Sequence, residues 1–142
     1  MLKLKKNNDN EIFYYYAAAA ATSIAGILHL ILASGIINRN LNTGIFFLVG
    51  GFAQVFWMLP MIKKWGKLWY YIGIGGTLVL ITIYVITRVP NPLTGGRALS
   101  INFMGVSIEV FQIAYIILTA IIIIKEKRTT ITTTTKNDNN RT

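Results

Sequence analysis

The sequence predicts an all-α polytopic membrane protein, an antiparallel bundle of four transmembrane helices with both chain termini in the cytoplasm. Of the 142 residues, 54% are hydrophobic and only 13% are charged, a balance too apolar for an ordinary soluble domain. The hydrophobic residues fall into four long runs, each near the ~20 residues that cross a bilayer core. Lys and Arg gather on one side of these runs, which is the pattern of cytoplasmic loops.

We place the helices at 13–37, 44–62, 68–87 and 104–124, which together form a transmembrane domain over 13–124. The first run is longer than the roughly 7 to 15 residues of a signal-peptide core, so we interpret it as a permanent span. Pro60 is expected to kink or end the second helix, and we favour a terminator beside Lys63 and Lys64 over a gating hinge. The remaining segments are a cytoplasmic N-terminal segment at 1–12, an external loop at 88–103, and a disordered cytoplasmic tail, rich in Thr and Asn, at 125–142.

The distribution of positive charge sets the orientation. Four crossings put both termini and the loop between the second and third helices on the same side of the membrane. Only Arg39, Arg88 and Arg97 of the 14 Lys and Arg residues lie on the other side. The positive-inside bias therefore predicts a multi-pass protein of the cell membrane with cytoplasmic termini. The net charge of +9 is accounted for by topology, and we expect no nucleic-acid partner.

Composition also limits the chemistry. There are no cysteines, which excludes disulfides, iron–sulfur ligation and covalent haem attachment. His29 is the only histidine, so one chain cannot supply two axial histidines to a haem. Neither a Ser-His-Asp set nor a pair of catalytic carboxylates stands out. We expect no enzyme activity, no cofactor and no metal.

A few polar residues interrupt the apolar runs and are the candidate site. Glu109 is the only carboxylate within the four predicted helices, and such a group is kept only where protein, water or an opposite charge surrounds it. His29 lies on a stripe of small residues along the first helix. From depth and spacing we predict an intramembrane polar cluster that faces the bundle axis in the outer half of the membrane: His29, Gln54, Arg88, Glu109 and Gln112.

The role of His29 and Glu109 has several interpretations. The first is a proton-relay pair, a metal-ligand pair or a binding site open to the outside. They also fit a buried interhelical hydrogen bond or ion pair that orients the helices, with Arg88 as a third member. A contact with another subunit is the third interpretation.

The external loop is the only substantial segment outside the membrane on that side. Pro90 and Pro92 stiffen it around Asn91, and two consecutive glycines permit a tight turn. The loop either folds back as a lid over Glu109, with Arg97 meeting that acid or a partner's acidic surface, or simply connects two helices.

Three stretches of sequence resemble a family of small, uncharacterised four-helix membrane proteins of ammonia-oxidising archaea and, more distantly, actinobacteria. They are GILHLILASG at 26–35, GIFFLVGGFAQVFWMLPMIKKWGKLWYYIGIGGT at 44–77 and ITRVPNPLTGGRALSINFMGVSIEVFQIAYI at 86–116. Some relatives carry a blue-copper domain, which this chain does not contain. The resemblance implies equivalent places for His29, Gln54, Arg88, Pro92 and Glu109 in the family pattern.

From these observations the sequence favours a non-catalytic accessory or structural subunit of a larger membrane complex, in contact with the lipid bilayer and other membrane subunits. Stripes of small residues along the helices favour such packing. The resemblance implies a candidate complex, a membrane-bound ammonia-oxidising copper monooxygenase. The alternative is a small transport or sensing module with an outward-facing pocket at His29 and Glu109 for a proton, an ammonium-like cation or a metal ion.

Overall fold

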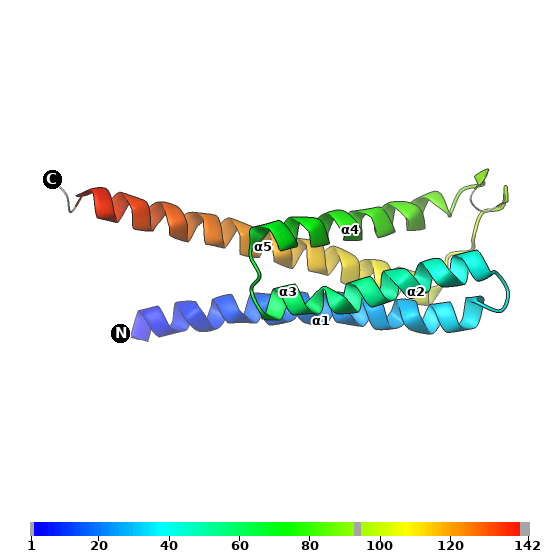
Figure 1. Ribbon diagram of the computed structural model, residues 1–142, viewed down its shortest axis with the longest axis horizontal. Coiled ribbons are helices and arrows are strands. Elements are labelled where there is room, and N and C mark those ends of the chain that lie inside the picture. The colour runs from blue at the N-terminus through cyan, green and yellow to red at the C-terminus, as the bar shows by residue number, and fades with distance from the viewer. Residues whose placement is uncertain (1, 93–94, 140–142) are drawn as a thin grey trace.

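The computed structural model describes the backbone of residues 2–92 and 95–139 and the side chains of 10–92 and 95–128. These residues form an all-helical structure (Figure 1). The helices are, in order, α1 (Leu2–Ile36), α2 (Leu41–Phe56), α3 (Met58–Ile62), α4 (Lys67–Ile86) and α5 (Phe103–Asn139).

The number of membrane-crossing helices agrees with the sequence prediction. Within the described part of the chain, four stretches are long and apolar enough to cross a bilayer: Asn10–Ile36, Leu41–Ile62, Lys67–Ile86 and Phe103–Arg128. The all-helical class and the presence of four helices able to span a membrane are therefore confirmed for the described residues.

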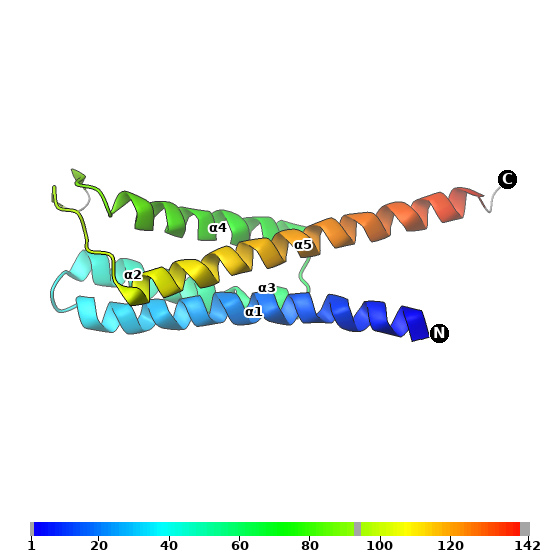
Figure 2. The ribbon, with the colours of Figure 1, turned by 180° about the vertical axis from the view of Figure 1, so that it is seen from behind.

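The helices are arranged around α1, which packs against α2, α3 and α5, while α4 packs mainly against α5. The first turns of α1 and the last turns of α5 lie at one end of the molecule, as Figures 1 and 2 both show. The connection 37–40 and the described parts of the connection between α4 and α5, 87–92 and 95–102, lie together at the other end, called the loop end below. Residues from all four spans can therefore meet at the loop end.

The backbone at both ends of the chain differs from the sequence prediction. Helix α1 begins at Leu2 rather than at residue 13, and α5 continues to Asn139 rather than ending at 124 before a disordered tail. Neither extension contains a proline or glycine that would stop a helix. The apolar runs therefore located the membrane-crossing part of these helices but not the residues at which the helices begin and end. Residues 1 and 140–142 lie outside the described part.

The second span is interrupted where Pro60 requires it. A proline inside a helix removes one backbone hydrogen bond, and its ring clashes with the carbonyl four residues earlier. That residue is Phe56, where α2 ends, and the short helix α3 contains the proline. The helix is thus broken one turn before the proline, and α3 then ends at Ile62, directly before Lys63 and Lys64.

Asparagine side chains start the two helices that leave the loop end. Asn40 accepts a hydrogen bond from the backbone N–H of Thr43 at 3.1 Å, at the beginning of α2. Asn102 accepts one from the N–H of Gly105 at the beginning of α5. These caps satisfy backbone donors that have no partner inside the helix, and they fix where each helix begins.

Helices α1 and α2 cross where two glycines face each other. A Cβ added at Gly26 would lie 2.7 Å from the carbonyl oxygen of Gly51, and one added at Gly51 would lie 2.9 Å from the carbonyl oxygen of Gly26. The hydroxyl of Thr22, one turn earlier, donates to the backbone carbonyl of Gln54 at 3.0 Å. Small residues let the two backbones approach this closely.

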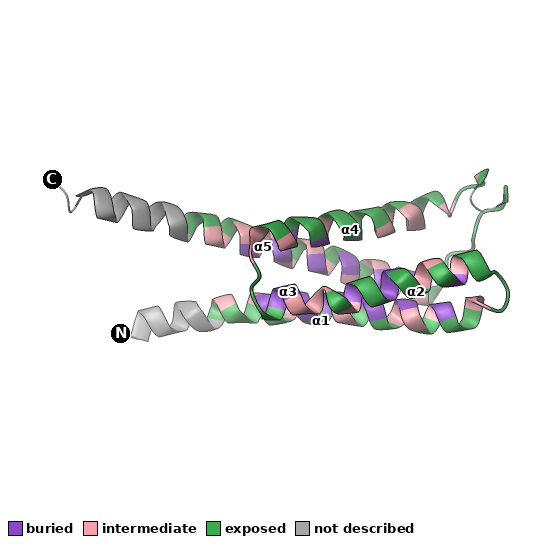
Figure 3. Cartoon of the chain, in the orientation of Figure 1, coloured by how far each residue is buried: buried purple, intermediate pink, exposed green. Residues whose placement is uncertain are grey.

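The main apolar core lies away from the loop end, between α1, α3, α4 and α5. Its largest fully buried side chains are Met61, Tyr70, Tyr115 and Ile122. Alanines on α1 complete this cluster. The outward faces of the helices are exposed (Figure 3), and they carry many large apolar side chains. A buried interior with an apolar exterior is the pattern expected of helices surrounded by lipid.

One charged residue within this part of the protein was not anticipated. The hydroxyl of Tyr15 on α1 donates to the carboxylate of Glu126 on α5, beside Lys64, whose amine lies 4.6 Å from the centroid of the Tyr15 ring. The sequence prediction ended the last helix before Glu126, so this link between the first and last spans was missed.

Candidate functional site

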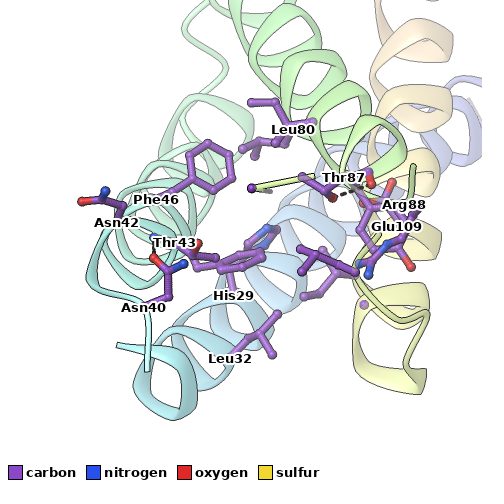
Figure 4. Close-up of a pocket in the computed structure, with 17 residues that line it drawn as sticks. His29, Leu32, Asn40, Asn42, Thr43, Phe46, Leu80, Thr87, Arg88 and Glu109 are labelled. Carbon is purple, nitrogen blue, oxygen red and sulfur yellow. Dashed lines mark hydrogen bonds between the residues drawn. The ribbon is translucent and has the colours of Figure 1, made fainter. Parts of the chain in front are cut away.

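A cavity of about 510 Å³ opens at the loop end and collects side chains from all four spans. In Figure 4, His29 of α1 lies between Thr43 and Phe46 of α2 on one side and Arg88 and Glu109 on the other. The volume is in the range of small-molecule sites. The structure therefore places three members of the predicted polar cluster around one space.

His29 is buried, with 4% of its surface exposed. Its Nδ1 lies 3.1 Å from the backbone carbonyl of Ala25, one turn back on α1. A carbonyl only accepts, so a neutral imidazole carries its proton on Nδ1 and presents Nε2 as an acceptor. The ring also contacts Phe47 of α2, with 5.5 Å between ring centroids. These contacts hold the imidazole in one orientation at the cavity wall.

Gln54 connects this cavity to the interior of the bundle. Its side chain lies beside the His29 ring, although Gln54 itself does not line the loop-end cavity. The side chain is 4% exposed, and its Oε1 has no hydrogen-bond partner among the described residues. The Oε1 atom of this amide therefore remains available as an acceptor.

Arg88 holds the loop against the cavity. Its guanidinium donates to the backbone carbonyl of Ser100 and lies 4.0 Å from the centroid of the Tyr84 ring, one turn earlier in the chain. The backbone N–H of Leu99 donates to the carbonyl of Thr87 at 2.9 Å. The segment around Ser100 is therefore tied to the end of α4 by a pair of hydrogen bonds, while the Tyr84 ring supports the guanidinium that donates one of them.

Glu109 lies one and a half turns into α5 and lines the cavity with Arg88 and His29. The positive charge of Arg88 acts on the Glu109 carboxylate through space. An acid and a base on the same wall balance each other's charge, which reduces the cost of placing either at this depth.

Two further polar atoms in this cavity lack partners. Arg88 Nε and the hydroxyl oxygen of Tyr84 are buried, and neither has a hydrogen-bond partner within the described part of the chain. Both residues line the cavity. Buried donors of this kind are normally satisfied by protein, water or a ligand. The cavity thus offers hydrogen-bond donors at Tyr84 and Arg88 and an acceptor at Glu109.

Gln112 is separated from the other members of the predicted cluster. It is 1% exposed and does not line the cavity, and neither its Oε1 nor its Nε2 has a partner among the described residues. Glu109 and Gln112 are three residues apart, which spans nearly a full turn, so they were expected to share a face. Helix packing instead seals Gln112 inside the bundle and leaves Glu109 at the cavity.

The external loop contributes Gly95 and Leu99 to the cavity wall, as a covering segment would. Asn91 donates to the backbone carbonyls of Ile86 and Val89, both at 2.8 Å, which caps the end of α4. Arg97 is exposed and is not part of the cavity lining. Arg97 therefore does not meet Glu109 in the cavity, and Arg88, the other basic residue proposed beside this acid, lines the cavity with it.

Pro90 and Pro92 are exposed and lie outside the cavity lining. Residues 93 and 94, which follow Pro92 in the predicted loop, lie outside the described part.

Some residues of the cavity were not selected from the sequence. Tyr84 lies four residues before Arg88, a spacing that places both on one helical face and could have identified the pair. Asn40 and Thr43 also line the cavity, and their spacing is that of a helix N-cap. Nothing in the spacing shows that this cap faces His29.

Comparisons of the chain with protein-family models, curated proteins and solved structures found no match.

Proposed function

We propose that this protein is a small, non-catalytic membrane module for transport or sensing that binds a polar ligand in the loop-end cavity. The observation that carries the proposal is the convergence of His29, Arg88 and Glu109 on one space of about 510 Å³. We further infer that the four spans cross the membrane in alternating directions with cytoplasmic termini. Lys and Arg are in excess in the two terminal segments and in the loop between the second and third spans, which supports this orientation. The loop-end cavity then opens to the outside.

The polar groups of the cavity favour binding over chemistry. His29 is held by Ala25 and Gln54, and Glu109 is the only carboxylate among the cavity-lining residues. General acid–base catalysis needs groups placed to give and take protons on a reacting substrate, and nucleophilic catalysis needs an activated nucleophile. The arrangement instead resembles a set of fixed hydrogen-bonding groups around a ligand.

The charges of the cavity narrow the class of ligand. A metal ion or ammonium-like cation near Glu109 would also meet the positive charge of Arg88, and an anion near Arg88 would meet Glu109. A small uncharged molecule that both donates and accepts hydrogen bonds avoids both conflicts. Such a molecule also satisfies the unpartnered groups of Tyr84 and Arg88.

Hydroquinone, which is small, uncharged and carries two hydroxyl groups, is a suitable probe for this cavity. We expect Glu109→Gln to weaken its binding about tenfold or more, because a hydrogen bond to a charged group contributes ~1.5 to 3 kcal/mol. Equilibrium dialysis with the protein in lipid nanodiscs measures the dissociation constant.

The control for this experiment is Glu11→Gln, which removes a carboxylate that lines a different pocket on α1. Binding by this variant is expected to match that of the wild type. Equal affinity of wild type and Glu109→Gln would remove the basis for a ligand site at Glu109 and leave only a packing role.

The second candidate function is an accessory or structural subunit of a larger membrane complex. The observation that favours it is the position of α4, which is the least buried of the four spans and exposes large apolar side chains. Examples are Leu68, Tyr71 and Val79. A helix with so little intramolecular packing suits a contact with another membrane protein. The sequence resemblance suggests a copper monooxygenase complex that oxidises ammonia.

If the chain is such a subunit, gentle extraction of native membranes should recover it in a particle much larger than its 15.9 kDa. Blue-native electrophoresis followed by mass spectrometry measures both size and composition. We expect Val79→Arg to release the chain from the particle, because a charge is costly at an apolar helix contact within the membrane. Recovery of the chain alone, or only with copies of itself, would exclude the subunit role.

A further inference from the structure

A second cavity, of about 350 Å³, lies between α2 and α4. Its lining is predominantly apolar and includes Val49, Ala53, Ile72 and Gly76. Val49 and Ile72 are 61% and 47% exposed, so this space, called the α2–α4 groove, opens on the outer face of the bundle. In a membrane that face borders lipid chains.

The α2–α4 groove adjoins the loop-end cavity. Phe46 of α2 and Leu80 of α4 line both spaces, and Figure 4 shows them at the edge of the loop-end cavity. A cavity with charged and polar groups in its wall is therefore followed, toward the middle of the spans, by one whose wall is almost wholly apolar. This order matches the polar head and the apolar tail of an amphiphilic molecule.

A polar atom marks the junction between the two spaces. Gln54 lines the α2–α4 groove, is 4% exposed and has an unpartnered Oε1. The same side chain contacts His29, which lines the loop-end cavity. A buried acceptor without a partner calls for a donor, and a hydroxyl on a ligand that occupies both spaces can supply one.

We propose that the ligand is an amphiphile whose uncharged, hydroxylated head lies among His29, Arg88 and Glu109 while its apolar tail lies in the α2–α4 groove. The inference rests on the proposed function, because it extends the same binding site. A phosphate or ammonium head is disfavoured by Glu109 or Arg88, respectively. The ligand reaches the site sideways from the bilayer, through the exposed side of the groove between Val49 and Ile72.

The structure provides a reporter at the far end of the groove. Trp57 lines it and lies eleven residues after Phe46, or roughly 16 Å along the helix at 1.5 Å per residue. Trp65 and Trp69 are the other tryptophans of the chain, and replacing both with phenylalanine leaves Trp57 as the single fluorophore. Its indole N–H donates to the backbone carbonyl of residue 69, which the replacement retains.

The test uses a hydroquinone with a ten-carbon tail that ends in bromine, a quencher of nearby indoles. In nanodiscs we expect the probe to quench Trp57 fluorescence in a saturable way. Gly76→Leu should raise the probe concentration for half-maximal quenching at least tenfold. A Cβ at Gly76 meets no atom within 4 Å, so the leucine can enter the groove without disturbing the helices. The matched control is Gly75→Leu, which is also uncrowded but does not line the groove, and it should leave quenching unchanged.

Three results would overturn the inference. If the probe quenches Trp57 equally well in Gly76→Leu and Gly75→Leu, or if quenching never saturates, the tail does not occupy the groove. If tail-free hydroquinone binds as tightly as the tailed probe, and both depend on Glu109, the loop-end site survives and the tail site fails. If neither probe responds to Glu109→Gln, the proposed function fails together with the inference.

Discussion

The Gly26→Leu variant is expected to be clearly less stable than the wild type. A side chain at Gly26 would meet the backbone of α2, with Gly51 O at 2.7 Å and the backbone nitrogen of Val55 at 2.9 Å from the new Cβ. Backbone atoms cannot rotate away, so the helices must separate. We expect a loss of at least the ~1 to 3 kcal/mol typical of an overpacked core. Unfolding by sodium dodecyl sulfate in mixed micelles, followed by circular dichroism, measures the change.

The matched control is Gly35→Leu on the same helix. Gly35 is exposed, and a Cβ added there meets no atom within 4 Å. This variant should unfold at nearly the same dodecyl sulfate concentration as the wild type. Both substitutions gain the same helix propensity, and they differ only in how crowded the new side chain is. Equal stability of the two variants would mean that α1 and α2 do not approach through Gly26.

The same substitution should also weaken the loop-end site. His29 follows Gly26 by three residues on the buried face of α1, and it contacts Gln54 and Phe47 of α2. A displacement of α2 would separate these contacts. Hydroquinone binding is therefore coupled to the α1–α2 crossing, although Gly26 does not line the cavity.

The sequence was informative about the spans because the bilayer imposes a length. A run of about 20 apolar residues is the shortest helix that crosses it, and this requirement located four spans. Helix ends obey different rules, and the N- and C-terminal extensions lacked the glycine or proline that would have marked a limit. The break at Phe56 was foreseeable from Pro60 and the position of the carbonyl four residues earlier.

The candidate site was predictable only in part. Depth along each helix grouped His29, Arg88 and Glu109, and the structure brings these three to one cavity. Depth does not specify how far each helix is rotated about its axis. Gln112 was consequently assigned to the same space as Glu109, although it is sealed inside the bundle.

The second cavity shows a further limit of sequence reasoning. Glycines in membrane helices are expected at close helix contacts, yet Gly50, Gly73 and Gly76 all line the α2–α4 groove. Small residues permit close approach but do not require it. Gly73 does pack closely, because a Cβ there would clash with the Tyr115 hydroxyl and the Trp57 ring, whereas one at Gly76 would meet nothing. Only the placement of α4 distinguishes the two cases.

Replacing Gln112 with methionine is expected to stabilise the protein. The amide is 1% exposed, and both of its polar atoms lack partners in the described part of the chain. Burying an amide without hydrogen bonds costs ~1 to 3 kcal/mol. Methionine has a similar length and shape but no such requirement. We therefore expect Gln112→Met to raise the free energy of unfolding by about 1 to 3 kcal/mol in the same micelle assay.

Gln112→Asn separates the polar effect from the effect of shape. It keeps an unpaired amide and removes one methylene group, so its free energy of unfolding should be lower than that of the wild type. The methionine variant should change this free energy in the opposite direction. A methionine variant that is less stable than wild type would mean that the Gln112 amide is satisfied in the membrane. Because Gln112 is enclosed by the helices of its own chain, that partner would have to be a buried water, which makes two to four hydrogen bonds to groups such as these.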